Sequence, residues 1–86
     1  MKIVYIPVFI RQIAKLEAGF QEEMMDKIQL LKDVKNHHYL KVHKLHGRLA
    51  NRYSFSVNYK THIVFTYISK QEIALLAIGD HTVYDE

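Results

Sequence analysis

The spacing of apolar residues changes from a helical to a strand period part-way along this chain. Between residues 9 and 31 apolar side chains recur every three or four positions, as in Phe9, Ile13 and Leu16. Between residues 53 and 59 aromatic and aliphatic residues instead alternate with serine and asparagine. These periods are typical of helices that cover one side of a core and of a strand with one wet face. The chain is therefore expected to combine N-terminal helices with a C-terminal sheet.

Turn-forming residues divide these patterns into elements. Pro7 suits the first turn of a helix, and Gly19 is expected to end that helix in the left-handed conformation. The connection over residues 35–50 lacks a clear period and leaves room for a short strand near Lys41–Leu45. The other expected elements are a strand over residues 2–6, a helix from Pro7 to about Gly19, a helix over 21–34, and strands over 53–59, 62–68 and 73–78.

This order predicts an α+β fold of the type β-α-α-β-β-β. Short turns between successive strands favour an antiparallel sheet, packed on one face by an N-terminal helical hairpin. Because strand side chains alternate, the apolar set Tyr53, Phe55 and Val57 is expected to face the helices. The remaining set on that strand, expected to face water, is Ser54, Ser56 and Asn58.

Length and composition limit the class of protein. A chain of 86 residues, of which 49% are hydrophobic, has enough apolar surface for one core, so residues 1–86 are expected to form a single domain. The absence of cysteine removes disulfides and thiolate ligands and favours a reducing compartment. No stretch approaches the roughly 18–20 apolar residues that cross a bilayer. The expectation is a soluble, cytoplasmic protein without membrane contact.

Acidic residues are absent from residues 35 to 70. That segment carries seven Lys or Arg residues and five of the six histidines, whereas acids and bases balance over residues 1–33. A merely solvated surface is the plain alternative, but a block of one sign in a small domain usually serves a polyanion such as nucleic acid. The histidines add groups that exchange protons near neutral pH. If His43 and His62 share the open face of the sheet, they could act on a phosphodiester in a groove suited to single-stranded RNA.

Several segments together resemble the RelE/ParE superfamily, the toxins of type II toxin–antitoxin pairs. The similarity spans the chain, since the β-α-α-β-β-β order also matches. The segments that carry it are Leu45-His46-Gly47-Arg48-Leu49, then Arg52-Tyr53-Ser54-Phe55-Ser56-Val57, then His62-Ile63-Val64-Phe65, and finally Ala74-Leu75-Leu76-Ala77-Ile78-Gly79-Asp80-His81-Thr82-Val83-Tyr84.

The resemblance implies a metal-independent, ribosome-dependent endoribonuclease that cuts mRNA, needs no cofactor and pairs with a cognate antitoxin protein. By position, His81 and Tyr84 match the family's C-terminal catalytic residues, and His43 matches a position occupied by a base. His62 stands where most active relatives have arginine, and it is counted with the catalytic candidates. The expected phosphate or RNA contacts are Lys41, Lys44, Arg48, Arg52 and Lys60.

Two alternatives to a nuclease stay open. One is a ParE-like inhibitor of DNA gyrase that acts by protein contact, although such relatives generally lack the histidines. The other is a weakened toxin that mainly binds its antitoxin, because His62 replaces a permanent, forked cation by a group that is only partly charged at neutral pH. A zinc site at His43-x-x-His46 is disfavoured, since the pair has no cysteine partner and no helical setting.

Overall fold

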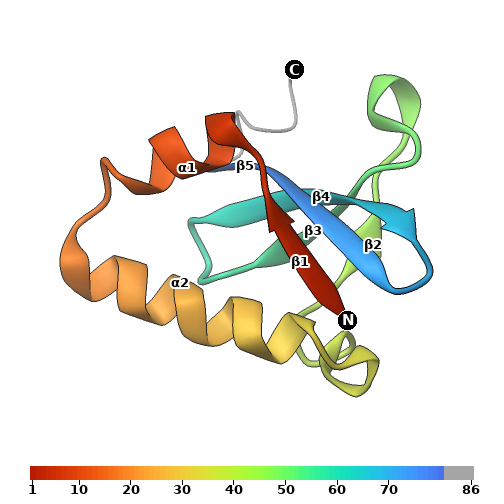
Figure 1. Ribbon diagram of the computed structural model, residues 1–86, viewed down its shortest axis with the longest axis horizontal. Coiled ribbons are helices and arrows are strands. Elements are labelled where there is room, and N and C mark those ends of the chain that lie inside the picture. Colours follow the sequence, from red (N-terminus) through yellow and green to blue (C-terminus); the bar gives the residue numbers. More distant parts are fainter. Residues whose placement is uncertain (81–86) are drawn as a thin grey trace.

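The computed structural model describes residues 1–80, apart from the side chain of Leu49, so His81 and Tyr84 lie outside the described residues. Within this range the elements form one sheet and a pair of helices (Figure 1). In chain order they are β1 (Lys2–Tyr5), α1 (Pro7–Ile13), α2 (Ala18–Leu31), the 3₁₀ turn η1 (Val34–Asn36), β2 (His43–Lys44), the 3₁₀ turn η2 (Gly47–Leu49), β3 (Tyr53–Ser56), β4 (His62–Ser69) and β5 (Glu72–Gly79).

Residues 1–80 contain one five-stranded sheet, with the strand order β1-β5-β4-β3-β2. The pairs β2–β3, β3–β4 and β4–β5 are antiparallel, whereas β1 and β5 are parallel. The predicted α+β class and the order β-α-α-β-β-β are confirmed, with β2 as the additional short strand near Lys41–Leu45. The prediction of an antiparallel sheet is wrong at the β1 edge, where the sheet is mixed. Short turns make β3, β4 and β5 antiparallel to one another. They do not determine the direction of β1, because all the other elements lie between β1 and its neighbour β5 in the sequence.

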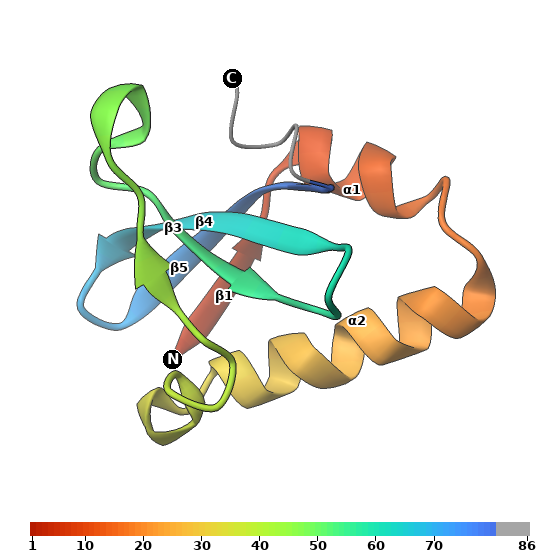
Figure 2. The ribbon, with the colours of Figure 1, turned by 180° about the vertical axis from the view of Figure 1, so that it is seen from behind.

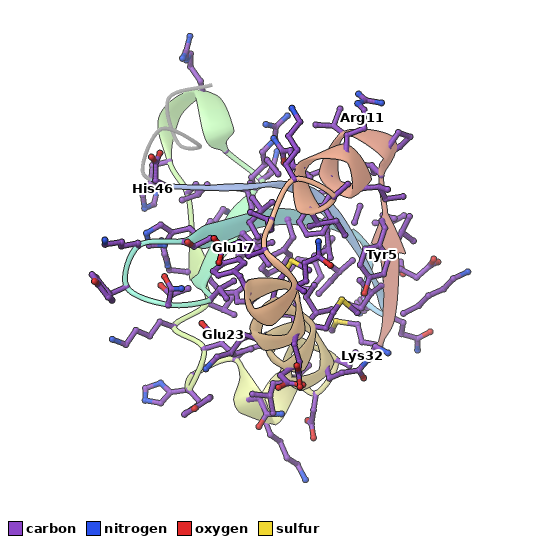
Figure 3. All side chains as sticks on the ribbon, turned by 90° about the vertical axis from the view of Figure 1, so that its left-hand side faces the viewer. Tyr5, Arg11, Glu17, Glu23, Lys32 and His46 are labelled. Atoms are coloured by element: carbon purple, nitrogen blue, oxygen red, sulfur yellow. The ribbon has the colours of Figure 1, made fainter. Side chains whose placement is uncertain are left out.

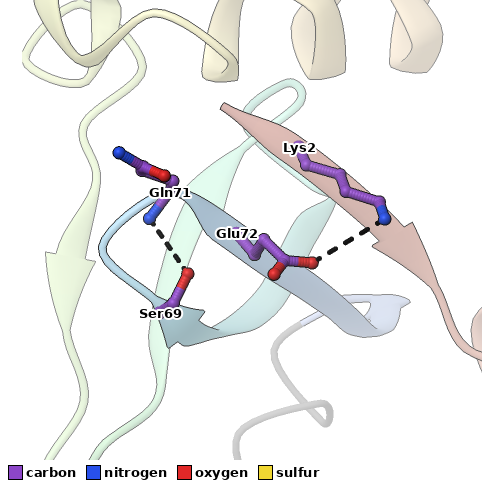
Figure 4. A network of polar contacts seen from close by, with 4 residues as sticks. All are labelled: Lys2, Ser69, Gln71 and Glu72. Carbon is purple, nitrogen blue, oxygen red and sulfur yellow. Dashed lines mark hydrogen bonds and ion pairs between the residues drawn. The ribbon is translucent and has the colours of Figure 1, made fainter.

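The β1 edge is held mainly by backbone pairing. Lys2 lies opposite Glu72, and their side-chain charges are 4.0 Å apart (Figure 4). Such an exposed pair contributes little to stability. The Lys2 N–H donates to the Gln71 carbonyl at 2.8 Å, and the Gln71 N–H donates to Ser69 Oγ at 3.2 Å. These bonds tie the start of β1 to the turn between β4 and β5.

Gly19 does not end the first helix, so that prediction is wrong. The helix α1 stops at Ile13, and Gly19 lies in the first turn of α2 without a left-handed backbone. The side-chain amide of Gln21 donates to the carbonyls of Ile13 at 2.8 Å and Leu16 at 3.0 Å. Because a side chain of α2 satisfies these carbonyls, the end of α1 needs no glycine there.

The core lies between the helices and one face of the sheet. Figure 3 shows the helices in front of the strands, with side chains filling the space between the two layers. Phe55 and Val57 belong to this core and Tyr53 packs against it, as predicted. The other core residues are Phe9, Met24, Ile28, Leu31, Leu40, Ile63, Phe65, Ile73, Leu75 and Ile78.

The strand predicted over residues 53–59 ends earlier, at Ser56. The side-chain oxygen of Asn58 accepts hydrogen bonds from the N–H groups of Lys60 and Thr61, both at 2.9 Å. An asparagine that folds back in this way forms a turn and competes with strand pairing. Tyr59 consequently sits in the β3–β4 turn instead of in the strand.

Candidate functional site

The register of the strands puts His43 and His62 on the same face of the sheet. His43 lies opposite Ser54, and His62 lies opposite Ser56. Residues directly opposite each other point to the same side, as do residues two apart on one strand. That side is the one that the helices leave uncovered, because Phe55 points into the core. From ideal sheet spacings, the Cα atoms of the two histidines are about 12 Å apart.

The serine side chains on this face are less exposed to solvent than expected. Ser54 is fully buried, with 0% of its surface exposed, so the prediction that it faces water is wrong. In the ladder it lies between His43 and Val64, whose longer side chains flank it. Ser56 is half-buried, as is Asn58 beyond the strand.

His43 is exposed, and a hydrogen bond orients its ring. Its Nδ1 atom is 2.9 Å from the carbonyl oxygen of Lys41, a residue with a left-handed backbone (φ 60°). A carbonyl can only accept, so Nδ1 carries the proton and Nε2 is the ring nitrogen that can take up another. This tautomer suits a general base whose Nε2 points away from its own backbone.

His62 is much less accessible than His43. Only 9% of its surface is exposed, and its Nδ1 lies 3.4 Å from Ser56 Oγ, a long contact for a hydrogen bond. It pairs across the sheet with Gly79, the last residue of β5. The two other predicted catalytic residues, His81 and Tyr84, follow β5 in the sequence and lie outside the described residues.

The loop between β2 and β3 carries two of the predicted phosphate contacts, Arg48 and Arg52. It is closed at its base by a 2.8 Å bond from the Leu45 N–H to the Arg52 carbonyl. Gly47 has φ 70°, a backbone conformation that suits glycine at this tight turn. The loop projects beyond the sheet in both ribbon views (Figures 1 and 2). Arg48 and Arg52 are both exposed.

The remaining predicted cations lie on or next to β2 and in the β3–β4 turn. Lys44 is exposed and lies opposite Tyr53, which packs against the core, so Lys44 and His43 point to opposite sides of the sheet. Lys44 therefore does not share the face that carries His43 and His62. Lys41 lies just before β2, and Lys60 in the β3–β4 turn has its ammonium 5.6 Å from the Tyr59 ring centre. The phosphate-binding role of all five cations stays a prediction.

Residues 1–80 contain neither a metal-binding cluster nor a membrane-spanning helix. No cluster of three or more His, Cys, Asp or Glu side chains that could hold a metal ion occurs in this part of the chain. None of the helices in the same range has the length and apolar character needed to span a membrane.

Comparison with known proteins finds similarity in three dimensions only. The sequence matches no protein-family model and no curated protein. A YoeB/ParE toxin from Agrobacterium tumefaciens has a TM-score of 0.76 at 20% identity, with 94% of this chain and 99% of that chain covered. The toxin–antitoxin complex RelBE2 from Mycobacterium tuberculosis gives 0.74 at 11% identity (93% and 96% covered), and the archaeal RelE–RelB complex from Pyrococcus horikoshii gives 0.72 at 11% (92% and 92%).

The chain has the RelE/ParE fold. In each comparison the similarity covers nearly the whole length of both chains, so it includes the helical hairpin and the sheet. The resemblance noted in the sequence is thereby confirmed at the level of the fold. Within this RelE/ParE fold, His43 and His62 are brought to one face, whereas Lys44 is not.

His37, which the sequence analysis did not single out, has a structural role at the end of α2. Its Nε2 donates to the Leu31 carbonyl at 2.9 Å, and Asn36 Nδ2 donates to the Leu30 carbonyl at 3.0 Å. Both bonds satisfy carbonyls at the C-terminal end of α2. The sequence signal was an Asn-His pair shortly after a predicted helix end, a position at which such donors are favoured.

Replacing His37 with alanine is expected to lower the free energy of unfolding by about 1 kcal/mol, the usual net value of one such hydrogen bond. Urea denaturation followed by circular dichroism measures this change. The matched control is His38→Ala, because His38 is the exposed neighbour and its loss is expected to stay within about 0.5 kcal/mol. Equal effects of the two substitutions would show that the bond to Leu31 contributes nothing.

Proposed function

We propose that this chain is the toxin of a toxin–antitoxin pair and that it cleaves mRNA on the ribosome by metal-independent acid–base catalysis. One observation supports this best. His43 and His62 occupy the same helix-free face of a RelE/ParE fold, and the Nδ1–H bond of His43 leaves its Nε2 as a proton acceptor. The acid-free segment of residues 35–70 supplies the surrounding positive charge that an RNA backbone requires.

The proposed reaction is an internal transfer at phosphorus. Nε2 of His43 accepts the proton of the ribose 2′-hydroxyl, and the 2′-oxygen attacks the adjacent phosphorus. The bond from phosphorus to the 5′-oxygen breaks, which leaves a 2′,3′-cyclic phosphate on one fragment. His81 donates the proton that converts the departing 5′-oxygen to a hydroxyl, and Tyr84 is the other proposed catalytic residue of this C-terminal segment. His62, when protonated, and Arg52 oppose the negative charge that develops on the phosphate oxygens.

A cognate antitoxin is the proposed protein partner. Two of the similar structures are described as a toxin–antitoxin complex and as a RelE–RelB complex. The partner of this chain is expected to carry an acidic or apolar segment that covers the basic surface and neutralises its charge. The proposed site of action of the free toxin is the cytoplasm, where ribosomes translate.

The test is to add the purified protein to translating ribosomes and to map the 5′ ends of the message. Cleavage within codons, with 5′-hydroxyl and 2′,3′-cyclic phosphate termini, is the expected result. Intact message at saturating protein would overturn the nuclease proposal. A parallel DNA supercoiling assay identifies the ParE-like alternative, which predicts inhibition of gyrase together with intact message.

The burial of His62 favours a second candidate function. A ring with 9% exposure, in place of the arginine of most active relatives, offers little contact to an incoming phosphate. This second candidate is a weakened toxin whose main activity is binding its antitoxin. Normal growth of cells that express the isolated gene, together with intact message, would favour it over both active alternatives.

A further inference from the structure

Two exposed tyrosines lie on turns, one before β2 and one between β3 and β4. Tyr39 is 66% exposed, and Tyr59, in the β3–β4 turn, is 83% exposed. A lysine ammonium lies near each ring, with Lys27 Nζ 5.2 Å from the Tyr39 centre and Lys60 Nζ 5.6 Å from the Tyr59 centre. Neither tyrosine belongs to the core. Exposed aromatic rings paired with cations are the combination that binds single-stranded nucleic acids.

The two tyrosines line one hollow. Its volume is about 290 Å³, which is near the lower end for small-molecule sites and suits a single flat group. Cations, aromatic rings and short polar side chains form its wall, with the apolar core beneath. The lining residues are Lys27, Tyr39, Leu40, Lys41, Ser56, Val57, Asn58 and Tyr59.

The hollow adjoins both histidines of the candidate site. Lys41 lines it, and the carbonyl oxygen of the same residue holds Nδ1 of His43 at 2.9 Å. Ser56 lines it as well, and its Oγ lies 3.4 Å from Nδ1 of His62. One lining residue therefore separates the hollow from each ring. A nucleotide joins its base to its phosphate through one sugar, so a base in the hollow would carry its phosphate toward these residues.

The tip that carries Tyr59 is held in place. The side-chain oxygen of Asn58 closes the turn by accepting the N–H groups of Lys60 and Thr61, and its Nδ2 donates to Glu23 Oε1 of α2 at 3.3 Å. These contacts anchor the turn to the helical layer. A ring on an anchored turn loses less freedom when a ligand stacks on it.

We propose that this hollow binds one nucleobase of the RNA substrate, stacked on Tyr59 or Tyr39, and so positions the neighbouring phosphate beside His43 and His62. The inference rests on the proposed nuclease function and adds a base-binding subsite to it. Recognition by stacking is tolerant of sequence, since every base has a π-face. Lys27, Lys41 and Lys60 supply charge around the base for the adjoining phosphates.

The experiment measures binding of a short, fluorescein-labelled 2′-O-methyl RNA, which lacks the 2′-hydroxyl and therefore cannot be cleaved. Tyr59→Ala and Tyr39→Ala are each expected to weaken binding by about 10-fold, because stacking of one base is worth about that factor. Tyr59→Phe keeps the ring and should bind as the unchanged protein does. Ile68→Ala, which removes another exposed apolar side chain outside the hollow, is the matched control.

Salt titration separates stacking from charge. Tyr59→Ala should weaken binding equally at all salt concentrations, whereas Lys60→Gln should reduce the slope of log affinity against log salt by about 0.7, the value for one phosphate contact to a single strand. Unchanged affinity of both tyrosine variants would overturn the base-binding subsite, as would a loss in Tyr59→Phe equal to that in Tyr59→Ala.

Further outcomes distinguish this inference from the proposed function. Cleavage of message on ribosomes by a protein whose tyrosine variants bind the probe normally would retain the nuclease and reject the subsite. Failure of the unchanged protein to bind the probe would reject the subsite as well. If the tyrosine variants no longer bind an antitoxin peptide but still bind the RNA probe, the hollow is a binding site for a protein partner and the inference is overturned.

Discussion

Replacing His43 with alanine is expected to lower the rate of mRNA cleavage on the ribosome by about 10²–10⁴-fold, the usual contribution of a positioned general base. The expectation follows from the bond between Nδ1 and the Lys41 carbonyl, which fixes the proton on Nδ1 and presents Nε2 as the acceptor. The side chain is exposed on a two-residue edge strand, so its removal should leave the fold intact. Single-turnover primer extension on translating ribosomes measures the rate.

His46→Ala is the matched control for this prediction. His46 is another exposed histidine of the same basic segment, lies three positions along the chain and sits at the rim of the molecule (Figure 3). Its replacement removes the same imidazole from the same region and is expected to leave the rate within about 3-fold, the range of a surface effect of roughly 0.5 kcal/mol. A loss in His46→Ala equal to that in His43→Ala would indicate that charge, and not a specific base, drives the reaction. An unchanged rate in His43→Ala would remove this residue from the mechanism.

The fold was predictable because its strongest signals are local. A period change near residue 34 separated helices from strands, and the alternation around Phe55 identified the core face. The ends of elements were less predictable where a polar side chain decides them. Gln21 of α2 donates to the carbonyl of Ile13, the last residue of α1, and Asn58 accepts from the N–H of Thr61 in its own turn just after β3. The spacing of hydrophobic residues predicts neither contact, because both are made by polar side chains.

The candidate site was predictable in part. His43 and His62 share a face because of two registers, His43 with Ser54 and His62 with Ser56, which alternation alone does not give. Once β2 is known to be a strand, the same alternation separates Lys44 from His43. The extent to which side chains on the open face are buried could not be predicted from the sequence, because it depends on the side chains of neighbouring strands.

The exposed tyrosines also escaped sequence reasoning. Tyr59 continued the alternating pattern of β3 and looked like a strand residue, although the strand ends at Ser56. The Asn58-Tyr59-Lys60 segment is better interpreted as a turn in which an aromatic residue follows an asparagine and precedes a lysine. Tyr39 lies in the irregular connection, where no period distinguishes core residues from exposed ones.

Replacing Phe65 with alanine is expected to lower the free energy of unfolding by about 3–5 kcal/mol, the usual cost of removing a buried aromatic side chain. Phe65 is fully buried, at 0% exposure, in the middle of β4. Its ring centre is 5.6 Å from that of Tyr53, 6.0 Å from Phe55 and 5.7 Å from Tyr67. Domains are typically stable by about 5–15 kcal/mol, so this one substitution removes a large share of the total.

The same residue is paired on both sides within the sheet. Phe65 lies opposite Tyr53 on β3 and Leu75 on β5, so its ring packs where three strands meet. Urea denaturation followed by circular dichroism measures the loss, and Phe65→Leu, which keeps most of the apolar volume, is the graded control and should lose less. Ile68→Ala, on the exposed part of the same strand, is expected to change stability by no more than about 0.5 kcal/mol. A loss below about 1 kcal/mol for Phe65→Ala would contradict the packing described for this aromatic cluster, since even partial collapse of the cavity cannot recover the buried contacts.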